Sequence, residues 1–519
     1  MSAELHRINV NVVVGEDGAA ELFGRLHSRW PQAPAAFLDS SDHARTSGAP
    51  GAPRRNRYSI LAFSLGPQAE TAQPTHAWEW LARTWRVDRA AAAGPRRDSR
   101  PTRPAPGDAE QAAPPFQLGW VGFAGYENQG RFFRATHAVV VDHAAHTAQL
   151  QTAEKDPDWE AVVRQELRDA AAPAAGGERE WAVSGAESRG SAEHSAAARP
   201  PEGTGPTALP QGRESAVPAA GRPLPHRPLT ELRVRDGRAD YLAKIGAAQK
   251  EIVDGNSYEV CLTTAVTGKL TGSPWQAYLR VRAHNRAPFT QYLYLPGAQD
   301  DITILSSSPE RFMQISSDGM ARSEPIKGTR PRSADPSEDM RLRHDLAEHP
   351  KDRAENVMIT DLVRNDLSVH AVPGTLRTER LCAVETYPTV HQMVSTVSAR
   401  LQLHAAAADA VSAAFPPGSM TGAPKISTME ILRRLESGSR GPYSGAAGYF
   451  SSSGACDLSV LIRTAVLSRP AGDSGEEWSF HLGLGGAITA DSSPEDEWQE
   501  IITKSRGVLG ALGAQFPLR

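Results

Sequence analysis

The stretch GGAITADSSPEDEWQEIITKSRGVL, residues 485–509, predicts an amphipathic helix that begins just after Ser493. Serine is a favoured N-cap residue, and Pro494 fits the first helical position because that position needs no backbone N–H donor. Glu495 and Asp496 complement the positive end of the helix dipole. The apolar side of this helix consists of Trp498, Ile501 and Val508.

Two predicted helices each carry acidic residues on one face, three or four positions apart. On the helix just described, this face consists of Glu497, Glu500 and Lys504. On KDRAENVMITDLVRNDL, residues 351–367, it consists of Asp352 and Glu355. Such faces are usually solvated and ion-paired. Two of them together could instead supply the hard oxygen ligands that Mg²⁺ takes beside an anionic ligand.

The segment SSSPERFMQI…SEPIKGTRPR, residues 306–332, offers a candidate nucleophile and a candidate acid. Lys327 precedes Gly328 and Thr329, and a lysine at such a turn can act as a nucleophile when burial lowers its pKa. Glu310 follows a proline at the head of a strand-like run. A surface lysine in a turn is the commoner structure for an isolated Pro-Ile-Lys-Gly, so the motif acquires meaning only from its context.

Three further positions suggest binding of an anion. In PPGSMTGAPKISTMEILRRLE, residues 416–436, Pro424 opens a helix just after Thr421, and a helix N-terminus with free N–H groups is either an anion site or an ordinary cap. Arg463 lies in the apolar run DLSVLIRTAVL, where a buried arginine needs a carboxylate partner from the protein or a ligand. Tyr449 lies in a glycine-flanked strand nearby in the sequence.

Composition excludes several classes of protein. The 519 residues include 56 Lys+Arg and 60 Asp+Glu, and a net charge of −4 disfavours a general nucleic-acid binder. Three cysteines are too few and too scattered for a disulfide framework or a zinc site. No stretch approaches the roughly 18 apolar residues of a membrane span, and no secretory signal pattern opens the chain. Glycine fingerprints for dinucleotides and nucleoside triphosphates are also lacking. We therefore expect a cytoplasmic globular protein.

The chain divides into an N-terminal region (1–168), a linker (169–230) and a C-terminal region (231–519). Residues 171–228 contain five large apolar residues in 58, too few to offset the entropy of ordering, so they predict a disordered linker. A weaker stretch at 91–114 predicts a flexible loop. Strand-like segments of the N-terminal region, rich in β-branched and aromatic residues, lie at 35–41, 57–65, 116–127 and 137–143.

The order of the motifs in the C-terminal region resembles one known family. These motifs are PIKGTRPR, DLVRNDL, ETYPTVHQMVSTV, FPPGSMTGAPK, GYF, IRT and GGAITADSSPEDEWQE. They resemble the chorismate-utilising enzymes, which include anthranilate, isochorismate, salicylate and aminodeoxychorismate synthases. The resemblance is strong over about residues 240–510 and weaker in the N-terminal segments FLDSS, RYSILAF and GWVGFAGYE. It implies an α+β fold, with a large, mainly antiparallel β-sandwich flanked by helices.

Two positions indicate the branch of the family. The resemblance implies that a lysine at 327 marks the aminodeoxychorismate-forming members, since the anthranilate-forming members have an alanine there. Isochorismate and salicylate synthases use a water-activating lysine where this chain has Glu259, so the nucleophile is not expected to be water. Two alternatives remain: an anthranilate-forming subunit, and a non-catalytic regulatory subunit that binds chorismate or tryptophan. Asp39 argues against bound tryptophan, because relatives commonly have a glutamate there.

The resemblance also implies residue roles. Lys327 would attack C2 of chorismate while Glu310 protonates the departing C4 hydroxyl, and ammonia would then displace the lysine. His391 is a further catalytic candidate, because Gln392 stands where many relatives have a histidine. Mg²⁺ would be held by Glu355 and Glu500, with Glu497 and Asp352 as second-shell or alternate ligands. The implied substrate contacts are Gly328, Thr329, Thr421, Tyr449, Arg463, Gly485, Gly486 and Lys504.

The resemblance implies a second subunit. Cys261, Cys382 and Cys456 all lie outside a glycine-rich nucleophile elbow, so we expect ammonia to come from a separate glutamine amidotransferase subunit or from free ammonium. The implied product would serve 4-aminobenzoate and folate synthesis or an antibiotic pathway.

Overall fold

The computed structural model describes residues 5–12, 14, 17–39, 57–85, 114–170, 225–387, 390–403 and 405–518. The expected linker at 171–228 and the expected loop at 91–114 lie outside these residues, except for their last few positions. None of the helices in the described ranges is long and apolar enough to cross a membrane.

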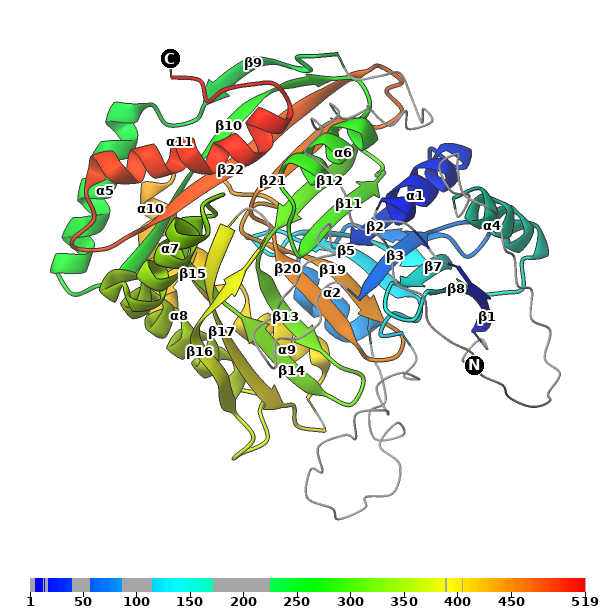
Figure 1. Cartoon of the computed structure of the whole chain (residues 1–519), viewed down its shortest axis with the longest axis horizontal. Helices are drawn as coiled ribbons and strands as arrows, with labels where there is room; N and C mark the ends of the chain where they lie inside the picture. The colour runs from blue at the N-terminus through cyan, green and yellow to red at the C-terminus, as the bar shows by residue number, and fades with distance from the viewer. Residues whose placement is uncertain are drawn as a thin grey trace, which may run out of the picture.

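Two antiparallel sheets dominate the described part of the chain (Figure 1). The first has twelve strands, in the order β1 (His6–Asn11), β8 (Thr147–Thr152), β7 (His137–Asp142), β3 (Tyr58–Phe63), β2 (Ala35–Asp39), β11 (Phe289–Leu295), β12 (Asp300–Ser308), β21 (Thr464–Pro470), β22 (Glu477–Ile488), β10 (Glu259–Thr271) and β18 (Gly422–Ala423), with β9 (Leu229–Val234) paired to β10. The second has ten strands, in the order β15 (Ile326–Pro331), β17 (Val390–Arg400), β14 (Met320–Glu324), β13 (Arg311–Ile315), β20 (Cys456–Val460), β19 (Ala446–Ser451), β5 (Gly119–Ala124), β6 (Gly130–Ala135) and β4 (Glu70–Ala72), with β16 (Arg377–Thr386) paired to β17.

Helices cover the outer face of each sheet. The first sheet packs against α1 (Gly18–Arg29), α4 (Pro157–Ala170), α5 (Arg238–Val253), α6 (Pro274–His284), α10 (Lys425–Leu435) and α11 (Pro494–Ala511). The second sheet packs against α2 (Ala77–Thr84), α8 (Pro350–Ser368) and α9 (Ala407–Ala414), and α7 (Pro336–Glu348) joins a smaller cluster with β16 and β17. A 3₁₀ turn, η2 (Gly418–Met420), precedes β18. In Figure 1, α5 and α11 lie next to each other across β10 and β22.

The inner faces of the sheets share a core, which makes the fold a sandwich. In β3, Leu61 and Phe63 pack toward the helices on the first sheet, whereas Ile60 and Ala62 join the core between the sheets. The strands are thus apolar on both faces, as expected for a sheet covered on both sides. The expected α+β fold, a mainly antiparallel sandwich flanked by helices, is confirmed.

Strands from both ends of the chain build each sheet. In the first sheet β2 pairs with β11, so that Phe37 lies opposite Tyr292. In the second, β5 pairs with β19, so that Val121 lies opposite Tyr449. The four strand-like segments of the N-terminal region correspond to β2, β3, β5 and β7. The N-terminal region therefore contributes strands to the same sandwich, while the boundaries at 168 and 231 stay predictions.

The helix from which the sequence analysis began is α11. It starts at Pro494, and the Ser493 side chain accepts a hydrogen bond from the Asp496 backbone N–H at 3.4 Å. Trp498, Ile501 and Val508 are buried in the core of the first sheet. The predicted cap and apolar stripe are both present, so this helix presents its acidic face away from that core.

Candidate active site

The sequence-predicted nucleophile lies where the edges of the two sheets meet. Lys327 is in β15, the edge strand of the second sheet, and its Nζ donates to Oε1 of Glu259 at 2.6 Å. Glu259 opens β10 of the first sheet, where it pairs with Ala423 of β18. The side chains of Lys327 and Glu259 are 11% and 0% exposed. The two sheets are thus joined at this point by a buried ion pair.

The surroundings of Lys327 stabilise its ammonium form. Burial lowers the pKa of Lys327, but the carboxylates of Glu259 and Glu355 outweigh it and raise the pKa well above the ordinary lysine value. In the ligand-free protein Lys327 is therefore protonated and cannot attack. A proton acceptor is required before this side chain becomes a nucleophile.

Glu310 has the opposite character, because it is a carboxyl group kept close to neutral. It lies between β12 and β13, and burial raises its pKa to about 7 against the opposing effects of Ser419 and Lys327. The Ser419 hydroxyl donates to Oε1 of Glu310 at 2.7 Å. A small pocket borders Glu310 and is also lined by Val363, Asp366, Pro417, Gly418 and Ser419. A carboxyl group with this pKa can donate a proton near neutral pH.

Three of the four expected metal ligands either lack a partner for one oxygen or are paired with a lysine. Burial raises the pKa of Glu355 and of Glu497, and Oε2 of Glu497 is buried with no hydrogen-bond partner among the described residues. Glu500 forms an ion pair with Lys504 at 2.6 Å. Lys351 lies 3.8 Å from Glu355 and also acts electrostatically on Glu497 and Glu500. These three carboxylates therefore attract positive charge, which the ammonium groups of Lys351 and Lys504 provide.

The fourth expected ligand, Asp352, is already paired. Its Oδ2 lies 2.9 Å from Arg330 and 3.1 Å from His349. Gly328, which has a φ of +85°, packs against it so closely that a Cβ at position 328 would lie 3.1 Å from the Asp352 Cβ. The glycine after Lys327 is thus required by the approach of α8 to β15, and Asp352 holds Arg330 at that contact.

Gly485 and Gly486 lie in β22 beside α11. The Nζ of Lys504 donates to the Gly485 carbonyl at 2.8 Å, and a Cβ on Gly486 would lie 2.9 Å from Oε2 of Glu497. The Tyr443 hydroxyl lies 3.2 Å from where a Cβ on Gly485 would be, so a side chain at position 485 would crowd this hydroxyl. The sequence analysis missed Tyr443, although its setting in Pro-Tyr-Ser-Gly parallels the glycine-flanked position of Tyr449.

The remaining substrate-binding candidates differ in what surrounds them. Arg463 is half-buried at a φ of +51°, and none of the described residues forms an ion pair with its guanidinium. Tyr449 lies in the core between the sheets, with its ring 5.3 Å from that of Phe116. Thr421 is buried, its hydroxyl donating to the Gly418 carbonyl at 3.1 Å. Arg463 is therefore the candidate whose guanidinium is available to bind an anion.

His391 contacts Asp339, a residue of α7. Its Nε2 lies 3.0 Å from Oδ1 of Asp339, and its Nδ1 lies 2.9 Å from the Thr386 hydroxyl. Asp339 also binds Arg332, which follows β15. These contacts attach α7 to β15 and β17, and the suggested catalytic role of His391 stays a prediction.

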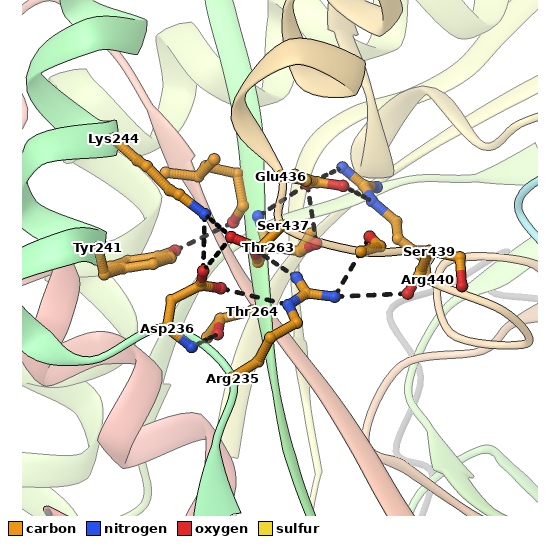
Figure 2. A network of polar contacts seen from close by, with 12 residues as sticks. Arg235, Asp236, Tyr241, Lys244, Thr263, Thr264, Glu436, Ser437, Ser439 and Arg440 are labelled. Carbon is orange, nitrogen blue, oxygen red and sulfur yellow. Dashed lines mark hydrogen bonds and ion pairs between the residues drawn. The ribbon is translucent and has the colours of Figure 1, made fainter.

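A buried polar network supports the strand that carries Glu259 (Figure 2). Arg440 donates to the carbonyls of Cys261 in β10 at 2.9 Å and of Met420 in η2 at 2.7 Å. The Nε and Nη2 of Arg440 also donate to Glu436, which in turn accepts hydrogen bonds from the backbone and the hydroxyl of Thr263. The network therefore holds β10 and the turn before β18 in one fixed arrangement.

Replacing Arg440 with methionine is expected to lower the free energy of unfolding by about 3–5 kcal/mol, because Glu436 becomes a buried charge without its partner. Urea denaturation followed by circular dichroism measures the loss. Arg434→Met is the matched control, since its ion pair with Glu251 is exposed and contributes at most about 1 kcal/mol. Equal stability of both variants would show that the network is not a structural support.

Comparison with known proteins identifies the family. The chain belongs to the family of chorismate binding enzymes, whose model matches residues 55–510. The expected resemblance is thus confirmed.

Individual relatives show which members of the family this chain is similar to. The chain is 40% identical over 414 residues to an aminodeoxychorismate synthase of Streptomyces pristinaespiralis, covering 76% of this chain and 51% of that protein. It is 42% identical over 422 residues to an aminodeoxychorismate synthase of Streptomyces griseus, with 78% and 51% covered. It is 43% identical to aminodeoxychorismate synthase component 1 of Klebsiella aerogenes over 282 residues, 54% of this chain and 59% of that one. The chain spans about half the length of the two Streptomyces proteins.

Solved structures agree on the fold. Anthranilate synthase component I of Streptococcus pneumoniae aligns with a TM-score of 0.62 at 21% identity, over 89% of this chain and 94% of that one. MenF, the menaquinone-specific isochorismate synthase of Escherichia coli, aligns with a TM-score of 0.61 at 17% identity, over 98% and 95%. At these identities the likeness establishes the architecture alone.

Proposed function

We propose that this protein converts chorismate and ammonia to 4-amino-4-deoxychorismate through a covalent bond between Lys327 and the substrate ring. The observation that carries the proposal is the presence of two buried groups with complementary chemistry, close enough to interact electrostatically: the amine of Lys327 in β15 and the near-neutral acid Glu310. The similarity to aminodeoxychorismate synthases at 40–42% identity supports the same reaction. An anthranilate-forming subunit and a non-catalytic subunit are the alternatives that the assay below separates.

The proposed substrate site provides donors for a dicarboxylate. Arg463, which has no acidic partner among the described residues, would bind one carboxylate together with the Tyr443 hydroxyl and backbone N–H groups at Gly485. Lys504 would line the ring side, because its Nζ already contacts the Gly485 carbonyl. Gly485 pairs with Thr263 of β10 and contacts Lys504 of α11, so these donors would orient the ring between Lys327 and the acidic helix faces.

The proposed chemistry divides between the two buried groups. The Lys327 amine forms a bond to C2 of the ring, the double bonds shift, and the C4 hydroxyl departs with a proton from Glu310. Ammonia then attacks C4, the double bonds shift back, and the lysine amine leaves. Glu310 recovers its proton from the incoming nitrogen, so it acts first as acid and then as base.

Mg²⁺ is proposed as the cofactor. Within the described residues no three His, Cys, Asp or Glu side chains gather closely enough to hold a metal by themselves. The donor set nevertheless suits Mg²⁺, which binds through one or two carboxylates together with substrate oxygens, and Oε2 of Glu497 is a buried acceptor without a partner. Glu355 and Glu500 would hold it, with Glu497 beside them, and it would neutralise the carboxylate on the substrate ring.

A glutamine amidotransferase subunit is proposed as the source of ammonia. The Klebsiella aerogenes relative is named as component 1, which implies a partner component for that protein. In this chain Cys261, Cys382 and Cys456 are all buried. A buried thiol is a poor nucleophile, and burial raises the pKa of Cys261 and of Cys382, so neither suits glutamine hydrolysis.

The test is a product assay with chorismate, Mg²⁺ and ammonium chloride, analysed by chromatography and fluorescence. We expect 4-amino-4-deoxychorismate, which an added lyase converts to 4-aminobenzoate. Fluorescent anthranilate as the main product would overturn the proposal in favour of the first alternative. Binding of chorismate without turnover under saturating ammonium would favour the second.

Replacing Glu500 with glutamine is expected to weaken Mg²⁺ binding in the presence of chorismate by roughly tenfold or more, because a carboxylate ligand becomes a neutral amide. Isothermal titration with Mg²⁺ measures the affinity directly, independent of turnover. Glu495→Gln is the matched control, since that residue lies on the same helix and is paired with Arg238. Unchanged affinity in Glu500→Gln would remove Glu500 from the metal site.

A further inference from the structure

We propose that Glu259 is a catalytic base, which removes the proton from Lys327 before the amine attacks and returns it when the amine leaves. The inference rests on the proposed function and names a residue to which the sequence analysis gave no catalytic role. Its foundation is the direct contact of Glu259 with the nitrogen that reacts.

The geometry suits a proton transfer inside a buried pair. Nζ of Lys327 and Oε1 of Glu259 are 2.6 Å apart, so the two groups are in direct contact through a charge-assisted hydrogen bond. The backbone of Glu259 is held by β18, since a Cβ on Gly422 would lie 1.9 Å from the Glu259 carbonyl oxygen. The carboxylate is therefore held by close packing rather than on a flexible loop, so the acceptor stays next to the amine.

The second oxygen of Glu259 points to the same conclusion. Oε2 is buried and has no hydrogen-bond partner among the described residues. A buried carboxylate oxygen without a donor is unfavourable, and taking up a proton removes the charge that makes it so. Glu259 thus has one oxygen in contact with Nζ and a second that no described residue occupies, which gives the carboxylate a site for a proton during the reaction.

Apart from Glu259, the ionisable groups near Lys327 are Cys261 from β10, Glu355 from α8, Glu310 from the turn after β12 and Glu500 from α11. Among the described residues, the hydrogen bond of Nζ goes to Glu259, whereas Glu355 and Glu500 act on Lys327 electrostatically. Glu310 must enter the reaction protonated in order to release the hydroxyl, and burial keeps Cys261 a thiol. Bound chorismate adds two negative charges, which strengthen the hold on the lysine proton. An acceptor in contact with Nζ is therefore needed, and Glu259 is the residue that the hydrogen bond supplies.

The proton balance closes over one turnover. The proton passes from the Lys327 ammonium to Glu259, giving a free amine and a carboxylic acid. The amine bonds to C2 while Glu310 releases its proton to the departing hydroxyl as water. After ammonia bonds to C4, the lysine leaves as a neutral amine and recovers its proton from Glu259, and the new ammonium group at C4 reprotonates Glu310. Both carboxyl groups end as they began.

The test compares Glu259→Gln with Glu259→Asp in the full chain, assayed with chorismate, Mg²⁺ and ammonium. Glutamine keeps a hydrogen-bond acceptor for Lys327 but cannot take its proton, so kcat is expected to fall by about 10²–10⁴-fold with little change in KM. Aspartate retains the base at a longer distance and is expected to recover part of the loss. The rate of Glu259→Gln should also rise with pH, because solvent must then remove the lysine proton before substrate binds.

Three results would overturn the inference: wild-type kcat in Glu259→Gln, equal activity of the Gln and Asp variants, or a loss confined to KM. Thermal unfolding shows whether each variant folds. If Glu259→Gln does not fold, Glu259→Asp, which keeps the ion pair, is compared with the wild type instead. A wild-type protein that makes no 4-amino-4-deoxychorismate would instead refute the proposed function. The two failures are therefore distinguishable.

Discussion

Replacing Lys327 with arginine is expected to reduce 4-amino-4-deoxychorismate formation by roughly 10³-fold or more, the scale expected when a catalytic nucleophile is removed. Arginine stays protonated and so cannot attack C2, yet it preserves the charge that pairs with Glu259. Product formation is measured with added lyase as 4-aminobenzoate. Intact-protein mass spectrometry after mixing with chorismate alone provides a second measurement, since the wild type should gain the mass of chorismate less one water and the variant should not.

The choice of substitution follows from the buried pair. Alanine at position 327 would leave the Glu259 carboxylate buried and uncompensated, at a cost of about 3–5 kcal/mol that would confuse lost chemistry with lost stability. Arginine avoids that cost. Lys250→Ala is the control for lysine removal in general, because Lys250 is 75% exposed and forms an exposed ion pair with Asp254, the residue that caps the end of α5. A Lys327→Arg variant that forms product at the wild-type rate would refute a covalent lysine intermediate.

Local signals explain how much of the fold could be predicted from the sequence. Ser493 and Pro494 mark the start of α11 because capping depends on neighbouring residues alone. The strands of the N-terminal region could also be predicted, because a preference of β-branched and aromatic residues for strands is likewise read from a short segment of sequence. The pairing of β2 with β11 joins residues about 250 positions apart in sequence, and no local pattern encodes that choice of partner. The sandwich was therefore predicted through the family resemblance, and its strand order needed the structure.

The candidate site, too, could be predicted from the sequence only in part. Lys327, Glu310 and Arg463 lie in recognisable motifs, but the partner of Lys327 is 68 positions away, at the start of β10 in the other sheet. The spacing of Glu436 and Arg440 is typical of an exposed helical pair, whereas the structure buries both beneath β10. Sequence patterns report residue type and spacing, not burial. Burial is what raises the pKa of Glu310 and leaves an oxygen of Glu259 without a partner.

Replacing Glu310 with glutamine is expected to lower kcat by about 10²–10⁴-fold, because hydroxide is a poor leaving group without a proton donor. Glutamine has nearly the same size and can still accept the hydrogen bond from Ser419, so the buried site is preserved. Lys327 remains intact in this variant, and the covalent adduct should therefore form slowly rather than not at all. Rapid mixing with chorismate, followed by mass spectrometry, measures that rate.

The pH dependence separates a proton donor from a merely structural carboxyl group. Glu310 must be protonated to act as an acid, and with a pKa of about 7 it loses its proton as pH rises through that value. We therefore expect kcat/KM of the wild type to fall above about pH 7, and this fall should be absent in Glu310→Gln. Ser419→Ala provides the matched test, since the Ser419 hydroxyl lowers the Glu310 pKa and its removal should move the fall to higher pH. A wild-type profile that stays flat above pH 7, or one that Ser419→Ala leaves in place, would show that Glu310 does not supply the proton.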